Sequence, residues 1–371
     1  MLGKKLINSF DAGFLLVILA ILLLGVLSIY TVTYSAGRAQ QTLYSKQLIW
    51  IGLGWVVFFV AAFIDYHELA RYSMLFYAAC VTLLVVVLLV GRTGMGARRW
   101  LSMGFFDIQP SEWVKLALVL VLARYFSMRA SAEGLGLRDL VPPVLLVLLP
   151  LALVLKQPDL GTALVLIFVL GVMLFFVGIR SKTVGYSILI SVMAFPFLWE
   201  VFWNALKPYQ RNRLITFINP AADPMGRGYH TLQSKIAIGS GGWFGKGAFE
   251  GTQSQLRFLP EGHTDFVFAV FAEEWGFFGV LVLLSLYLML LLWGIDTAYK
   301  AKDRLGVFLA VGVISIFVFY LTVNMGMTLG LVPVVGVPLP LMSYGGNSLL
   351  TIMAGLGLLL NIKLRRFMLF Y

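Results

Sequence analysis

Charged side chains are scarce in this sequence of 371 residues. Only 12% of the residues are Asp, Glu, Lys or Arg, whereas 60% are hydrophobic. Soluble domains carry about 25% charged residues. The composition therefore excludes the water-soluble classes and predicts a polytopic membrane protein.

Cysteine and histidine are scarce as well. The single cysteine, Cys80, lies in an apolar run, so no intrachain disulfide can form. The three histidines are scattered, which gives no support for a zinc site. The phosphate-binding pattern GxxxxGKS/T is missing, so nucleotide triphosphate chemistry gets no support either. We expect no zinc, no nucleotide and no nucleic-acid partner.

Long hydrophobic runs dominate the sequence instead. About 20 helical residues span a bilayer core, and these runs are too long and too uniformly apolar for barrel strands. The sequence therefore predicts an all-α polytopic membrane protein in which residues 1–371 form one integral membrane domain. About ten transmembrane helices are expected, with a long extracytoplasmic loop between helices 7 and 8. The expected spans are residues 13–32, 46–64, 70–90, 113–127, 140–155, 161–179, 184–204, 265–297, 306–331 and 344–362.

The distribution of Lys and Arg predicts the orientation. An even number of spans puts both termini on the same side. If that side is the inside, inner segments hold 14 of the 28 basic residues, and seven of the other 14 lie in the long loop 205–264. Long loops translocate largely regardless of charge, so we expect cytoplasmic termini and an external loop. Basic residues on the outer face suggest an anionic partner there, although lipid head groups explain any single one equally well.

Carboxylates cluster just before one of the hydrophobic runs. Residues 258–274 read FLPEGHTDFVFAVFAEE and precede 21 residues without a charge. Asp265, Glu273 and Glu274 therefore lie at one membrane face or in a polar cavity opening there, where carboxylates need water, a partner or a substrate. At least one of the two glutamates should face the bundle interior. Thr264 or Asp265 could instead simply cap the following helix.

Three further segments carry polar residues with both a structural and a functional interpretation. Arg99 and Trp100 lie where an aromatic suits the membrane interface, so an interfacial anchor is the alternative to a functional role. Glu112 and Lys115 are three residues apart and can form a structural ion pair. Asp159 lies in the turn KQPDLGT, whose chemistry explains the proline and glycine but does not require the carboxylate.

Two irregular segments complete the pattern. In the long loop, YQRNR (209–213) supplies two guanidiniums, which suit bidentate phosphate binding, and GYHTLQS (228–234) adds amide and hydroxyl groups. A pyrophosphate-bearing lipid would use such groups. Residues 332–347 contain three prolines and three glycines, so irregular backbone is expected there, packed against protein or a water-filled cavity.

These segments together resemble the SEDS family (shape, elongation, division and sporulation). The motifs run in order along nearly the whole chain and are highly specific in combination: GARRWL (96–101), QPSEWVK (109–115), QPDLGTA (157–163), YQRNR (209–213), GYHTLQSKIAIGSGG (228–242), LPEGHTDF (259–266), AEEWG (272–276) and PLPLMSYGG (338–346). The stretch GTQSQLRFLPE (251–261) is similar to the RodA-like branch rather than the FtsW-like branch.

The resemblance implies a ten-helix peptidoglycan glycosyltransferase of the bacterial inner membrane. It would polymerise lipid II, a disaccharide-pentapeptide on undecaprenyl pyrophosphate, on the outer face during cell elongation. Its partner would be a class B penicillin-binding protein, the transpeptidase of the pair. Asp265 matches the essential aspartate of the family. Other residues fall in motifs that line the family's outer-facing cavity: Arg99, Trp100, Glu112, Lys115, Asp159, Arg213, Gln233 and Ser343. Asn347 departs from the pattern, because Ser or Thr usually follows SYGG.

A mechanism follows from the chemistry of that reaction. The acceptor hydroxyl is a weak nucleophile at neutral pH, so a positioned carboxylate can accept its proton, and Asp265 is the candidate base. One base and no enzyme nucleophile imply a single displacement with inversion. Cations stabilise the leaving pyrophosphate, and the candidates are Arg99, Lys115, Arg213 or a divalent ion. Magnesium or manganese is a candidate cofactor because Glu112, Asp159 and Asp265 are hard oxygen ligands, although their spacing does not show that they converge.

Other functions stay open. A lipid II flippase would use the same polar cavity to move the head group, but it needs access from both faces, whereas the long loops cluster on one. A structural scaffold would not explain a basic, Gln-rich loop beside the acidic residues at the start of a membrane helix. The FtsW-like division branch of the same family is a further alternative.

Overall fold

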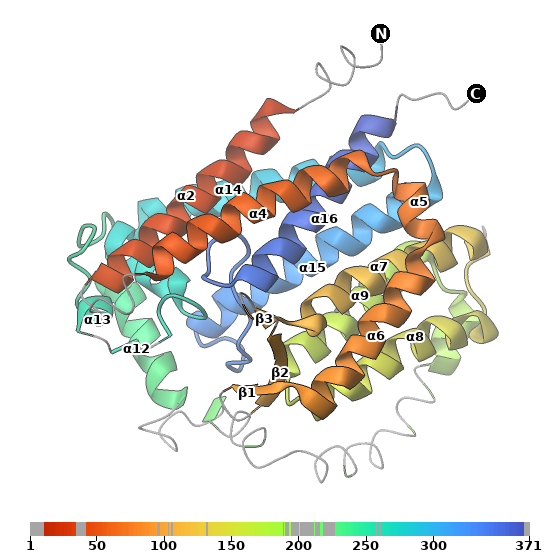
Figure 1. Cartoon of the computed structure of the whole chain (residues 1–371), viewed down its shortest axis with the longest axis horizontal. Coiled ribbons are helices and arrows are strands. Elements are labelled where there is room, and N and C mark those ends of the chain that lie inside the picture. Colours follow the sequence, from red (N-terminus) through yellow and green to blue (C-terminus); the bar gives the residue numbers. More distant parts are fainter. Residues whose placement is uncertain are drawn as a thin grey trace.

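A computed structural model shows the chain as an assembly of helices (Figure 1). It describes residues 11–366 apart from 35–41, 95–96, 103, 105–106, 131–132, 188, 190–192, 194–199, 201–210, 212–215, 218–226, 257 and 260. The helices are α2 (Ala12–Tyr34), α4 (Leu43–Phe63), α5 (Tyr66–Arg71), α6 (Ser73–Val90), α7 (Pro110–Arg129), α8 (Leu137–Lys156), α9 (Leu160–Val177), α12 (Arg227–Ser240), α13 (Thr252–Gln255), α14 (Val267–Tyr299), α15 (Arg304–Thr328) and α16 (Gly346–Arg365).

The helices confirm an all-α polytopic membrane protein. Within the described ranges, eight helices are long and apolar enough to cross a membrane, and they match eight of the ten expected spans. The helix α7 matches the span expected at 113–127, but it carries Glu112, Lys115 and Arg124 and is buried over most of its length. The span expected at 184–204 lies largely outside the described residues.

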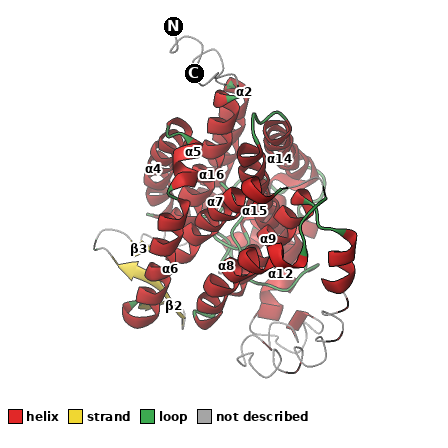
Figure 2. Cartoon of the chain, turned by 90° about the vertical axis from the view of Figure 1, so that its right-hand side faces the viewer, coloured by secondary structure: helices red, strands yellow, loops and turns green. Residues whose placement is uncertain are grey.

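The centre of the molecule is formed by α7, α15 and α16, which lie between the outer helices (Figure 2). In α15 and α16, 72% and 83% of the most apolar stretch is buried, whereas the other six spans bury between 22% and 44%. The outer helices expose leucine, valine and phenylalanine side chains. Helices that are apolar all round suit lipid on one side and protein on the other.

Both ends of the described chain lie on the same side, which we call the terminal face. Lys363 near the end of α16 pairs with Asp11 just before α2 at 2.7 Å. Trp293 of α14 donates its ring N–H to the same carboxylate at 2.5 Å. The hydrogen bond from Lys363 holds the pKa of Asp11 below its usual range. This arrangement agrees with the even number of crossings expected from the sequence.

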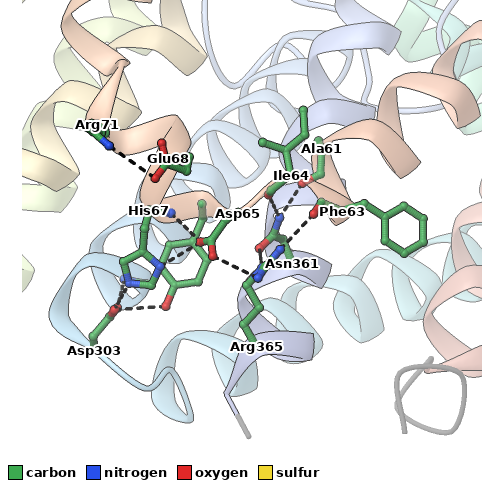
Figure 3. A network of polar contacts seen from close by, with 12 residues as sticks. Ala61, Phe63, Ile64, Asp65, His67, Glu68, Arg71, Asp303, Asn361 and Arg365 are labelled. Carbon is green, nitrogen blue, oxygen red and sulfur yellow. Dashed lines mark hydrogen bonds and ion pairs between the residues drawn. The ribbon is translucent and has the colours of Figure 1, made fainter. Parts of the chain in front are cut away.

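A second polar network lies at the terminal face (Figure 3). The two ring nitrogens of His67 contact carboxylates of Asp65 and Asp303 at 2.9 and 2.7 Å. Arg365 of α16 pairs with Asp65 at 3.0 Å, and Asn361 donates to two backbone carbonyls at the end of α4. The ends of α4 and α16 are thereby tied to the turn that precedes α15.

The opposite side, which we call the loop face, holds more structure than the sequence predicts. The outer segment expected at 91–112 contains three antiparallel strands in the order β1 (Arg92–Gly94), β2 (Ala97–Ser102) and β3 (Asp107–Ile108). The helices α12 and α13 lie within the expected loop 205–264. Residues 331–345, between α15 and α16, are irregular as predicted.

Candidate functional site

Asp265 lies on the loop face in a turn that leads into α14. The N-cap position of α14 is Phe266, whose side chain makes no capping hydrogen bond. The hydroxyl of Thr264 contacts the side chain of Glu261 at 3.0 Å. A Cβ built on Gly336 would lie 3.3 Å from Oδ2 of Asp265, and Gly336 has a φ of +75°. The Asp265 carboxylate thus lies directly against the irregular segment before α16, at a position where glycine allows close contact.

Ser343 fixes the turn that carries Asp265. Its hydroxyl donates to the carbonyl of Thr264 at 2.6 Å and accepts from the backbone of Leu339 at 2.8 Å. The backbone of Tyr344 donates to the carbonyl of His263 at 2.9 Å. Burial lowers the pKa of His263, so this imidazole is neutral near physiological pH. Ser343, a predicted site residue, is thus joined to Asp265 through the backbone.

Two residues of α15, Tyr320 and Asn324, contact the candidate site residues but were not predicted from the sequence. The Asn324 side chain donates to the carbonyls of Asp265 and Val337 at 3.0 and 2.7 Å. The Tyr320 hydroxyl contacts the Glu112 carboxylate at 3.3 Å. Polar residues inside a membrane span are functional candidates by default, and that signal was present in the sequence.

The predicted ion pair between Glu112 and Lys115 is formed and is enclosed. The two groups lie 2.7 Å apart, with 8% and 0% of their side chains exposed. Lys115 also donates to the Tyr320 hydroxyl. An anion can reach the Lys115 ammonium only if this pair opens, so the structure supports the structural interpretation over direct phosphate contact.

Asp159 caps the helix α9. Its carboxylate accepts from the backbone and from the hydroxyl of Thr162, at 3.2 and 3.0 Å. Turn chemistry does not require this carboxylate, but the start of α9 uses it as a helix cap. A Cβ built on Gly161 would lie 3.4 Å from the carbonyl of Val335. The start of α9 therefore contacts the same irregular segment that faces Asp265.

Arg99 joins the small sheet to the turn before Asp159. From β2 it donates to the carbonyls of Gln157, at 3.0 Å, and Pro158. These are carbonyls at the end of α8, where cationic donors stabilise a helix. Trp100 is half-buried and pairs with Arg92 across the sheet.

Asn347, the departure from the family pattern, connects α16 to the start of α7. Its side chain donates to the carbonyl of Asp107 at 2.8 Å and accepts from the backbone of Gln109 at 3.2 Å. An amide supplies both a donor and an acceptor in fixed directions. The Asn347 side chain therefore helps to hold the helix that bears Glu112.

Gln233 and Arg213 come from the long loop. Gln233 is half-buried on α12, whose next residue, Ser234, donates to the carbonyl of Thr328 at 2.8 Å and so attaches α12 to the end of α15. Arg213 lies outside the described residues.

Both glutamates of the AEEWG motif face the interior, as predicted for at least one. Glu273 is fully buried and accepts from the side chain of Lys246 at 2.7 Å and from the backbone of Gln253 at 3.0 Å. Glu274 accepts from the Thr31 hydroxyl of α2 at 3.0 Å. The motif therefore holds the segment after α12 against α14 and α2.

The glycine of that motif breaks α14. Gly276 has non-helical angles, φ 64° and ψ −163°. The backbone N–H of Phe277 donates to the carbonyl of Gly242 at 2.9 Å, and the backbone N–H of Lys246 donates to the carbonyl of Glu273 at 3.0 Å. Backbone groups released by the break are thus paired with the segment after α12, as they must be at membrane depth.

The three predicted metal ligands do not form a ready site. Across the described part of the chain, no group of three or more His, Cys, Asp or Glu side chains is placed to hold a metal ion. Glu112 is engaged by Lys115, and Asp159 caps α9. These donors do not fit a metal held by the protein alone.

Comparisons with known proteins agree with the sequence motifs. A family model described as "Cell cycle protein", for FtsW, RodA and SpoVE, matches residues 11–367. The peptidoglycan glycosyltransferase MrdB of Escherichia coli K12 is 40% identical over 368 residues, covering 97% of this chain and 95% of that protein. The peptidoglycan glycosyltransferase RodA of Treponema pallidum is 34% identical over 429 residues, covering 97% of this chain and 99% of that protein.

A solved structure has the same fold. The crystal structure of the Thermus thermophilus rod shape determining protein RodA matches with a TM-score of 0.70 and 32% identity, covering 96% of this chain and 98% of that one. The described fold, the order of the motifs and these matches lead to one conclusion: the chain belongs to the FtsW/RodA/SpoVE family.

Proposed function

We propose that this protein is a peptidoglycan glycosyltransferase that polymerises lipid II on the outer face of the bacterial inner membrane. The observation that carries the proposal is the Asp265 carboxylate, held against Gly336 at the junction of α14, α15 and the irregular segment before α16. Relatives named peptidoglycan glycosyltransferase, at 40% and 34% identity over almost the whole chain, support the assignment.

The reaction is a single displacement. The acceptor sugar hydroxyl attacks the anomeric carbon of the donor while the bond from that carbon to the pyrophosphate oxygen breaks. Asp265 accepts the hydroxyl proton, and the electron pair of the broken bond leaves with the pyrophosphate. General bases contribute about 10²–10⁴-fold to such rates. Attack from the face opposite the leaving group inverts the anomeric configuration.

The leaving pyrophosphate needs cations, and the predicted candidates differ in their contacts. Lys115 is enclosed with Glu112 and Tyr320, so we assign it to holding α7 against α15. Arg99 donates to backbone carbonyls. Arg213 remains the proposed phosphate ligand, because its guanidinium suits bidentate phosphate contacts.

A divalent cation is a separate prediction. Substrate pyrophosphate supplies oxygen ligands that the protein alone lacks, so magnesium or manganese would bind together with lipid II. Polymerisation measured after exhaustive treatment with a chelator, and again after each ion is restored, tests this. Full activity in the chelator contradicts it.

The relatives support a proposal for the partner and the cellular role. A structure described as "Structural coordination of polymerization and crosslinking by a peptidoglycan synthase complex" matches this chain with a TM-score of 0.80 and 35% identity. We propose a class B penicillin-binding protein as the partner. A role in elongation fits the MrdB and RodA relatives, at 40% and 34% identity, while FtsW relatives at 35–36% keep the division role as the alternative.

The purified chain, reconstituted with that transpeptidase in liposomes containing lipid II, tests the function. Glycan strands should form, and they should be visible after separation by length. Movement of fluorescent lipid II across the bilayer without polymer would favour the flippase instead.

A further inference from the structure

Asn324 is a buried amide close to the end of α15. Its side chain is fully inaccessible to solvent. The nitrogen Nδ2 donates to the carbonyl oxygen of Asp265 at 3.0 Å and to that of Val337 at 2.7 Å. Backbone carbonyls only accept hydrogen bonds, so the NH₂ group, and not the oxygen, must face them. Both hydrogens of the amide are thereby used.

The two carbonyls belong to the two parts of the chain that define where the Asp265 carboxylate lies. One is the carbonyl of Asp265 itself. The other is that of Val337, which directly follows Gly336, the residue against which Oδ2 of Asp265 is placed. A single side chain therefore fixes both the residue that bears the carboxylate and the segment that faces it.

Neither part is held by regular secondary structure. Asp265 precedes the first residue of α14, and residues 331–345 are irregular. Their backbone groups cannot rely on a helix or sheet ladder, so they depend on side chains such as Asn324 and Ser343. Ser343 fixes the turn from the side of Thr264. Asn324 fixes it from the side of α15.

We propose that Asn324 is a positioning residue for Asp265: it sets the place of the carboxylate relative to the acceptor hydroxyl without touching substrate. This inference rests on the proposed role of Asp265 as general base. A misplacement of about 1 Å at a reacting group lowers a rate by roughly 100-fold. Loss of Asn324 should therefore lower kcat and leave KM for lipid II nearly unchanged.

The chain contains a matched control in Asn361. This asparagine of α16 is also fully buried, and its amide also donates to two backbone carbonyls, those of Ala61, at 2.8 Å, and Ile64 (Figure 3). It lies at the terminal face, at the opposite end of the molecule from Asp265. Replacement of Asn361 removes the same kind of bridge away from the site, together with the hydrogen bond that its side-chain oxygen accepts from Arg365 at 3.0 Å.

The experiment measures kcat and KM for lipid II polymerisation, per mole of monodisperse protein, for Asn324→Ala and Asn361→Ala. Each change is also made in the Asp265→Asn background. We expect Asn324→Ala to lower kcat between 10- and 100-fold, with KM changed by less than about twofold, and to have no further effect on Asp265→Asn. Asn361→Ala should reduce thermal stability but keep kcat. Asn324→Ser, which retains one donor, should restore part of the rate.

Two results would overturn the positioning role of Asn324 while leaving the proposed role of Asp265 intact. One is an equal loss of kcat in Asn324→Ala and Asn361→Ala. The other is that Asn324→Ala lowers kcat by the same factor in the wild type and in Asp265→Asn. A general structural role would act in both backgrounds. If Asp265→Asn alone keeps the wild-type rate, the proposed base is wrong, and the positioning role falls with it.

Discussion

Lys115 and Glu112 form an ion pair of 2.7 Å that is enclosed between α7 and α15. The Tyr320 hydroxyl contacts both partners, and the Lys115 ammonium lies 4.7 Å from the centre of the Tyr320 ring. Charges inside a membrane protein require such partners, because water is not there to solvate them. The pair therefore holds α7 against α15, the helix whose Asn324 contacts Asp265.

Removal of one partner of this pair should destabilise the protein more than removal of both. Lys115→Met leaves the Glu112 carboxylate buried and unpaired, which costs about 3–5 kcal/mol. The double variant Glu112→Gln with Lys115→Met should lose less. Thermal unfolding of the purified variants in detergent measures this. The exposed pair of Lys300 and Asp296 is the control, since loss of a surface pair costs about 0–1 kcal/mol. A double variant less stable than Lys115→Met would contradict the prediction.

Asp159 should tolerate asparagine if its role is to cap α9. Asparagine accepts the same hydrogen bond from Thr162 and caps a helix about as well as aspartate, whereas alanine costs about 0.5–2 kcal/mol. We expect Asp159→Asn to keep most of the polymerisation rate and Asp159→Ala to unfold at lower temperature. A large loss of rate in a stable Asp159→Asn protein would show instead that the charge acts on substrate or metal.

Gly276→Ala should disturb the segment after α12. A Cβ at this position would overlap the backbone of Gly245 and Phe244, and the positive φ adds strain of about 1–3 kcal/mol. We expect a lower unfolding temperature and faster proteolysis within residues 241–256. Gly171→Ala in α9, where a Cβ meets nothing within 4 Å, is the matched control and should be neutral. Equal behaviour of the two variants would mean that the break does not need glycine.

The terminal face should be cytoplasmic and the loop face external. Gln253, in the external loop, is half-buried, so the exposed Glu250 is a better position for a labelling cysteine. In a Cys80→Ala background, Glu250→Cys should react with an impermeant thiol reagent in intact spheroplasts. Glu68→Cys, on α5 at the terminal face, should react only after permeabilisation. The reverse labelling pattern would show that the loop face is cytoplasmic and the terminal face external.

The sequence predicts the membrane spans well because hydrophobicity alone decides them. The expected spans 13–32 and 306–331 match α2 and α15 to within three residues. The break at Gly276 could not be predicted, since it lies at the start of an apolar run and depends on contacts with residues 242–246, which come much earlier in the chain. Contacts of that kind have no local signature.

The site was predicted in part. Motif resemblance selects Asp265 and Ser343, and the structure joins them through the Thr264 carbonyl. Tyr320 and Asn324 were missed because α15 was treated as a span, although two polar residues four positions apart share one face of a helix. The cap formed by Asp159 was also missed, despite an aspartate directly before an apolar run, which is a recognised helix start signal.

The most direct test of the central claim compares the wild type with Asp265→Asn in polymerisation of purified lipid II, each with its transpeptidase partner. The amide keeps the size of the side chain but cannot accept the proton at neutral pH. The account predicts a rate at least about 10²-fold lower, with the wild-type unfolding temperature and partner binding retained. A well-folded Asp265→Asn protein that makes glycan strands at the wild-type rate would contradict it.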